Sequence, residues 1–84
     1  MEVKIEILKV MVVDGKKVGK SLTFPMSPEA MARYKTKAKV VKMVKEYAVK
    51  VGVFTEAELE GEGVTIKMDE FLEEWRKEVR KQAG

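Results

Sequence analysis

The sequence predicts a small α+β domain in which a three-stranded antiparallel sheet packs against helices. Three observations support this fold class. Asp14-Gly15 separates two β-rich runs, Ser27-Pro28 opens a long helical pattern, and a second helical pattern follows a short alternating run near the C-terminus. The chain has 84 residues, of which 45% are hydrophobic and 37% charged, and this suits one globular domain over residues 1–84.

The two β-rich runs, residues 2–13 and 16–24, are predicted to form a β-hairpin. Asp-Gly favours a type I′ turn, because both central residues of that turn need a positive φ. Residue 13 then faces residue 16, and one face of the hairpin collects the apolar pairs that a core needs. Those pairs are Ile5 with Phe24, Ile7 with Leu22, and Met11 with Val18.

The same register places Lys9 opposite Lys20 on the apolar face, which is unfavourable. Either both lysines reach past the edge of the covering helix, or a bulge near Gly19 shifts the pairing.

The other face of the first strand carries Leu8, Val10 and Val12 among polar residues. If no helix covers this face, the three residues mark a partner or dimer surface. Two helices are available, so the C-terminal one either packs beside the long helix or covers this row.

Residues 28–51 are predicted to form one long helix, with Ser27 as its N-cap and Gly52 as its stop. A capping box made by Thr55 and Glu58 then opens a short helix over 56–60.

A short strand over 64–67 and a C-terminal helix over 69–82 complete the prediction. The first strand is expected in the centre of the sheet, with the third strand on its free edge.

The chain contains no Cys and no His, which removes disulfides, thiolate nucleophiles, typical zinc sites and imidazole bases. Asp69, Glu70, Glu73 and Glu74 are interpreted as the acidic first turns of a helix, where carboxylates complement the helix dipole. We therefore expect no catalytic residues, no metal site, no cofactor and no enzymatic activity.

No apolar run approaches the ~20 residues of a membrane span. The N-terminus alternates apolar and charged residues, unlike a signal peptide. A soluble, cytoplasmic protein without membrane contact is the expectation.

Projection of the long helix gathers Lys35, Lys39, Lys42, Lys45 and Lys50 away from its apolar side. These residues are a candidate polyanion-binding site. A solvated helix face is the favoured interpretation, because an oppositely charged segment of the same chain must pack nearby. Residues 26–55 carry seven basic and two acidic groups, whereas residues 56–78 carry three basic and nine acidic groups.

The stretch KSLTFPMSPEAMARYK resembles the strand and first helix of ribbon-helix-helix repressors, and KVGVFTEAEL is similar to the turn before their second helix. The resemblance covers residues 20–60 and implies DNA reading by alternate strand residues, here Lys20 or Ser21 with Thr23. The intervening helix is about twice the family's length, and a full strand precedes the ribbon.

The composition is typical of designed scaffolds and of hyperthermophile proteins, since Asn and Cys are absent while Lys and Glu are abundant. We expect a thermostable domain without chemistry of its own, either a designed scaffold or a thermophile-type interaction module. A nucleic-acid-binding protein is the alternative. A monomer is expected, with a homodimer through the outer sheet face as the other arrangement.

Overall fold

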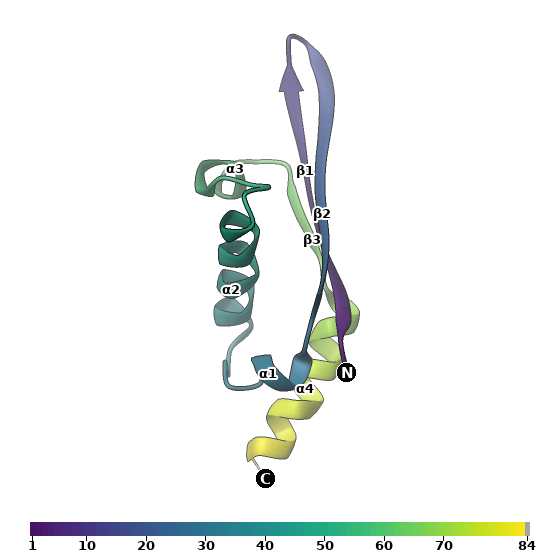
Figure 1. The fold of residues 1–84 in the computed structure, drawn as a ribbon, viewed down its shortest axis with the longest axis vertical. Coiled ribbons are helices and arrows are strands. Elements are labelled where there is room, and N and C mark those ends of the chain that lie inside the picture. Colours follow the sequence, from purple (N-terminus) through teal and green to yellow (C-terminus); the bar gives the residue numbers. More distant parts are fainter. Residues whose placement is uncertain (84) are drawn as a thin grey trace.

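The computed structural model describes residues 1–83 and confirms the predicted α+β class (Figure 1). Three antiparallel strands form one open sheet in the order β2-β1-β3, with β1 in the centre as expected. The elements are β1 (Val3–Val13), β2 (Lys16–Met26), α1 (Pro28–Met31), α2 (Lys37–Lys50), α3 (Glu56–Glu60), β3 (Val64–Lys67) and α4 (Asp69–Ala83).

The hairpin has the predicted turn and register. Asp14 and Gly15 both have positive φ, at 52° and 76°, as a type I′ turn requires. Pairing is continuous from Val13–Lys16 to Val3–Met26, so no bulge forms near Gly19. The three predicted apolar pairs all form: Ile5–Phe24, Ile7–Leu22 and Met11–Val18.

The second strand is longer than predicted, because it continues through Pro25 to Met26. Proline lacks the N–H that a central strand must donate, yet it is tolerated where that position faces away from the sheet. β2 is an edge strand, and Pro25 lies at an edge-facing position opposite Lys4.

The predicted single helix over 28–51 is wrong, because the structure divides it into α1 and α2 with residues 32–36 between them. Thr36 has an extended backbone and accepts a hydrogen bond from the Lys39 N–H at 3.3 Å, so it caps a new helix. The Trp75 indole N–H donates to the carbonyl oxygens of Met31 and Tyr34, at 3.0 and 3.1 Å. These contacts satisfy carbonyl groups where the helix is broken.

The other predicted helix boundaries hold to within one residue. Ser27 caps α1, and the capping box of Thr55 and Glu58 opens α3. α4 begins at Asp69 as predicted and extends to Ala83.

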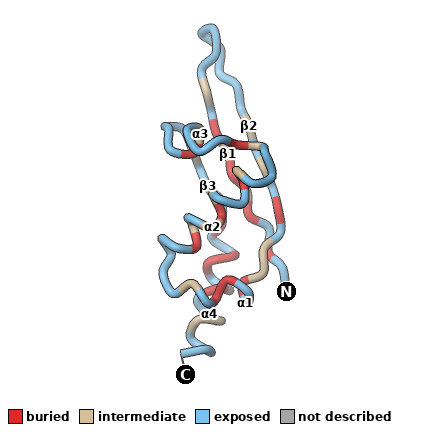
Figure 2. Tube along the Cα trace, turned by 60° about the vertical axis from the view of Figure 1, so that its left-hand side comes forward, coloured by how far each residue is buried: buried red, intermediate tan, exposed pale blue. Residues whose placement is uncertain are grey.

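α2 runs along one face of the sheet, whereas α4 lies at the lower end of the sheet, next to α1 (Figures 1 and 2). Side chains of the sheet, of α2 and of α4 form one core there. The C-terminal helix therefore takes neither expected position fully: it joins the core on the same side as α2 but packs against α1, and within residues 1–83 no helix covers the opposite face of the sheet. Core residues less than 1% exposed include Ile5, Ile7, Val40, Val44, Ala48 and Phe71.

The molecule is elongated, with extents of 53 × 19 × 18 Å. The far end of the hairpin projects beyond α3 and β3 as a two-stranded arm, and most of this arm is exposed (Figures 1 and 2). The arm begins where pairing with the third strand stops. β3 pairs with Glu6–Lys9 of β1, and Gly63, just before β3, accepts one further hydrogen bond from the Val10 N–H at 3.1 Å.

Candidate binding surfaces

The predicted partner surface forms a continuous row on the uncovered face of the sheet. We call this the outer face, and it carries the even-numbered residues of β1. Leu8 is half-buried, whereas Val10 and Val12 are 53% and 70% exposed. The structure brings the three predicted residues together and leaves them open to solvent.

Small residues lie on both sides of this row. Gly19 and Gly63 flank Val10, while Ser21 and Thr65 flank Leu8. Leu8 and Val10 therefore have smaller residues on both sides, whereas Val12 lies beside Lys17 of β2 and beyond the end of β3.

The backbone requires glycine at position 63 but not at position 19. Gly63 has a φ of 80°, and a Cβ there would lie 2.6 Å from the Val10 carbonyl oxygen, so only glycine fits. Gly19 has no positive φ, and a Cβ added to it would meet no atom within 4 Å. The fold of the single chain therefore does not require glycine at position 19.

The free edge of β2 is protected against strand addition. In a two-residue hairpin Val13 and Lys16 form the closing hydrogen-bonded pair, so odd-numbered residues of β2 direct their N–H and C=O groups away from β1. Lys17 and Pro25 lie at such positions, and lysine and proline are residues that blunt open edges.

Lys9 and Lys20 meet on the inner face, where one glutamate binds both. Lys9 is 8% exposed and donates to the backbone carbonyl of Glu58, in the middle of α3. The Lys20 ammonium donates to the Glu58 carboxylate oxygens at 3.1 and 3.2 Å. The hydrogen bond from the Thr55 backbone N–H, followed by that from Lys20, lowers the pKa of the Glu58 carboxyl below its ordinary value. The predicted lysine clash is thus resolved by α3 at the point where the arm begins.

The strand residues implied by the ribbon-helix-helix resemblance do not form one reading surface. Lys20 lies on the inner face with Glu58, while Ser21 and Thr23 are exposed on the outer face. β2 is also paired with β1 of its own chain along its whole length.

The five candidate polyanion-binding lysines separate into three environments. Lys35 precedes α2 and donates to the Gln82 side-chain oxygen at 3.2 Å. Lys39 and Lys50 are exposed near the two ends of α2. Lys42 and Lys45 line an open groove with acidic residues of α2 and α3. None of the five forms an ion pair within residues 1–83.

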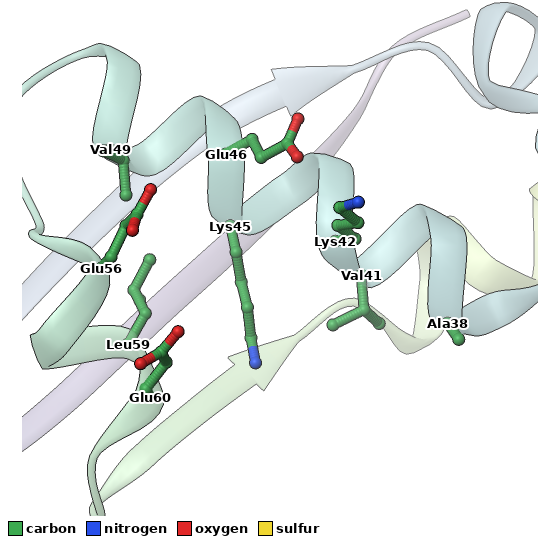
Figure 3. A pocket seen from close by; sticks show the side chains of 9 residues that line it. All are labelled: Ala38, Val41, Lys42, Lys45, Glu46, Val49, Glu56, Leu59 and Glu60. Carbon is green, nitrogen blue, oxygen red and sulfur yellow. The ribbon is translucent and has the colours of Figure 1, made fainter.

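The groove has a volume of about 470 Å³ and lies between α2 and α3 (Figure 3). Its apolar lining includes Val41, Val49 and Leu59, and its carboxylates come from Glu46, Glu56 and Glu60. Carboxylates of the acidic segment therefore come near Lys42 and Lys45, while Lys39 does not line the groove. No acidic residue lies in the first turn of α2 to offset the lysines there.

Of the acidic residues predicted to open the C-terminal helix, Glu74 pairs within α4, with Lys77 at 3.3 Å. Within residues 1–83, no group of three or more His, Cys, Asp or Glu side chains is arranged to hold a metal ion. In this part of the chain no helix combines the length and the hydrophobicity needed to cross a bilayer.

Comparisons with known proteins gave no match to any protein-family model, curated protein or solved structure.

Proposed function

We propose that the chain is a non-catalytic interaction module that binds a protein through the outer face of its hairpin. The observation that carries this proposal is the exposure of the row Leu8, Val10 and Val12, at 53% for Val10 and 70% for Val12. A contiguous apolar row on an otherwise charged monomer is typical of a protein contact surface. β1 pairs with β2 along its whole length, so a partner meets an ordered strand and little ordering cost opposes binding.

The composition supports the non-catalytic part of this proposal. The chain lacks His and Cys, which supply most general bases and the strongest nucleophiles at neutral pH. The two shifted carboxyls, Glu29 and Glu58, have lowered pKa values because they accept hydrogen bonds, Glu29 first from the Ser27 hydroxyl and Glu58 first from the Thr55 N–H. A carboxyl held ionised in this way is a poor proton donor near pH 7.

Selection from a random peptide library tests the proposed surface and requires no assumption about which protein binds it. Wild-type protein is the target, immobilised sparsely so that copies do not meet, and the double variant Val10→Lys, Val12→Lys is the counter-target. We expect enriched peptides that bind wild type and lose binding to the double variant. Peptides that bind both proteins equally, or no enrichment, would contradict the proposal and favour a scaffold without a binding role.

A second candidate function is polyanion binding by the lysines of α2. It is supported by the absence of ion pairs for Lys35, Lys39, Lys42, Lys45 and Lys50 within residues 1–83. Titration with duplex DNA at two salt concentrations tests it. About four neutralised phosphates would give a slope of log K against log salt near −3 to −4. Affinity should be lost on changing Lys35, Lys39 and Lys42 to Glu, and absence of binding at low salt rejects this function.

A further inference from the structure

We infer that the free edge of β3 is a further protein-binding site, which takes an extended peptide segment of another protein as a fourth strand of the sheet. This site is separate from the outer face and does not depend on the function proposed above. Three features support it: the backbone groups that β3 directs away from the sheet, the apolar lining of the groove beside α2, and the lysine in that groove.

β3 directs part of its backbone away from the sheet. The Val10 N–H bonds to the Gly63 carbonyl, so even-numbered residues of β1 point their backbone groups at β3, and Thr65 points back. The N–H and C=O groups of Val64 and Ile66 therefore face outward. β3 is an edge strand, and no hydrogen bond within residues 1–83 reaches these outward groups.

The edge of β3 is open to strand addition, in contrast to the edge of β2 with its Lys17 and Pro25. Val64 and Ile66 are β-branched, and their half-buried side chains pack against the core, which holds the edge extended. Their outward N–H and C=O groups repeat at about 7 Å along the strand. This pattern of donors and acceptors is complementary to another extended backbone, so the occupant is a strand.

The groove between α2 and α3 lies on the side of the sheet that such a strand would share. In strand addition, alternate side chains of the added peptide enter pockets beside the edge. Peptide residues opposite Val64 and Ile66 would direct their side chains to the inner side, where α2 lies. Val41 and Lys45 extend from α2 to the side on which β3 runs (Figure 3), and Leu59 adds to the apolar lining. An apolar peptide side chain would be buried there.

Lys45 favours an acidic residue in the peptide. Its side chain is half-buried in the groove and forms no ion pair within residues 1–83. Salt screens a partly buried pair less than an exposed one, so a carboxylate placed here would be held effectively. The groove carboxylates of α3, Glu56 and Glu60, favour a basic residue at the end of the peptide near α3.

The charge of the groove also distinguishes a peptide of another protein from a second copy of this chain. β3 reads Val-Thr-Ile-Lys and contains no acidic residue. A second β3 added at this edge would therefore bring no carboxylate to Lys45. The expected occupant has apolar residues at alternate positions and an Asp or Glu among them.

Amide hydrogen exchange of the free protein tests the geometry of the edge. The N–H groups of Thr65 and Lys67 bond to β1, so they should exchange at least about tenfold more slowly than those of Val64 and Ile66. Added peptide should slow exchange at Val64 and Ile66. Equal protection of all four amides in the free protein would overturn the outward assignment.

Peptide selection tests the occupant. The target is the double variant Val10→Lys, Val12→Lys, so that peptides for the outer face are not recovered. The counter-target carries Ile66→Pro in addition, which removes an outward N–H and no hydrogen bond of the fold. We expect enriched peptides with alternating apolar residues and an acid, and Ile66→Pro should weaken their binding at least about tenfold. The matched control is Ile66→Ala, which also shortens the side chain but keeps the N–H, and should bind within about threefold of the target.

A charge reversal gives a second test that leaves the backbone of β3 unchanged. Lys45→Glu should weaken binding of the acidic peptides at least about tenfold. Its control is Lys50→Glu, which makes the same change at an exposed position of α2 outside the groove. Lys50→Glu should bind as the target does. Equal affinity of the two variants would overturn the assignment of Lys45.

The two binding proposals fail in distinguishable ways. No enrichment, or peptides bound equally by Ile66→Pro and Ile66→Ala, overturns the edge site. If Ile66→Pro instead abolishes self-association of the protein without peptide, the occupant is a second copy and the inference is overturned. The outer-face proposal is unaffected by either result, because it depends on peptides that require Val10 and Val12.

Discussion

The hairpin has a covered half and a free half that share one alternation of side chains. In the covered half, residues 3–9 of β1 pair with β2, residues 6–9 also pair with β3, and the inner side chains share one core with α2 and α4. In the free half, residues 10–19 have no helix on either face, and Val12, Val13 and Val18 are 70%, 50% and 42% exposed. The same alternating pattern thus gives a core in one half and an open surface in the other.

The difference teaches that burial on this sheet depends on where β3 and α3 end. Lys9 and Lys20 mark the boundary, because α3 reaches both of them through Glu58 and no element reaches beyond. Apolar residues before this boundary contribute to folding, and those after it are available for binding.

The largest expected effect contrasts one truncation in each half. Ile7→Ala removes a fully buried side chain and should lower the free energy of unfolding by about 2–5 kcal/mol. Val12→Ala removes an exposed one and should change it by less than about 0.5 kcal/mol. Urea denaturation at low protein concentration measures both. Equal losses in the two variants would show that the arm is part of the core.

A second prediction concerns the hydrogen bonds from Trp75 of α4 to the backbone at the break between α1 and α2. Trp75→Phe keeps most of the buried ring but removes the N–H that binds the carbonyls of Met31 and Tyr34. The Tyr34 carbonyl then loses the indole, while the Met31 carbonyl keeps the Tyr34 N–H, and stability should fall by about 1–3 kcal/mol. Denaturation of this variant alongside Val79→Ala, a half-buried position on the same helix, gives the comparison. An unchanged Trp75→Phe would mean that the break between α1 and α2 does not depend on the indole.

A third prediction concerns Thr36, the N-cap residue of α2. Thr36→Ala removes the hydroxyl that accepts the Lys39 N–H, and should cost about 1 kcal/mol. Thr36→Ser retains a hydroxyl and should restore most of the loss. If alanine were neutral, the capping role of Thr36 would be rejected.

The smallest effect lies at the boundary between the halves and depends on pH. The folded-state pKa of Glu58 is lowered from 4.5, so its contribution is present above that pH and is lost as the pH falls through the lower, folded value. Glu58→Gln should therefore destabilise the protein at pH 7 and flatten the fall in stability below pH about 4.5.

Thermal melts between pH 3 and 7 compare Glu58→Gln with Glu60→Gln, which removes an exposed carboxylate of the same helix. Parallel pH profiles for wild type and both variants would contradict the role of Glu58.

The sequence predicts the strand pairing of the hairpin more accurately than it predicts the helices that cover it. Asp14-Gly15 defines the turn, and alternation then defines every pair, because a slip by one residue would place Ile5 and Ile7 in solvent. The break at residues 32–36 was not predicted. It contains no proline or glycine, and the Trp75 indole that binds its carbonyls lies more than forty residues further along the chain.

The candidate surfaces were predicted to different degrees. The row of Leu8, Val10 and Val12 follows from strand periodicity alone, but both faces of β1 are apolar, so periodicity could not show which face the C-terminal helix covers. The prediction that the five lysines share one helix face assumed a single continuous helix over residues 28–51. The break moves Lys35 off α2, and the groove brings carboxylates of α3 near Lys42 and Lys45.

Heteronuclear NMR spectra recorded while a peptide selected against the wild-type protein is added test the central claim, that the outer face of the hairpin is a binding surface. We expect the amide shifts of Val10, Val12 and Gly19 to move progressively as the peptide binds, while those of α2 and α4 remain fixed. Shifts that stay constant up to about 500 µM peptide, or that move on α2 instead, would contradict the claim.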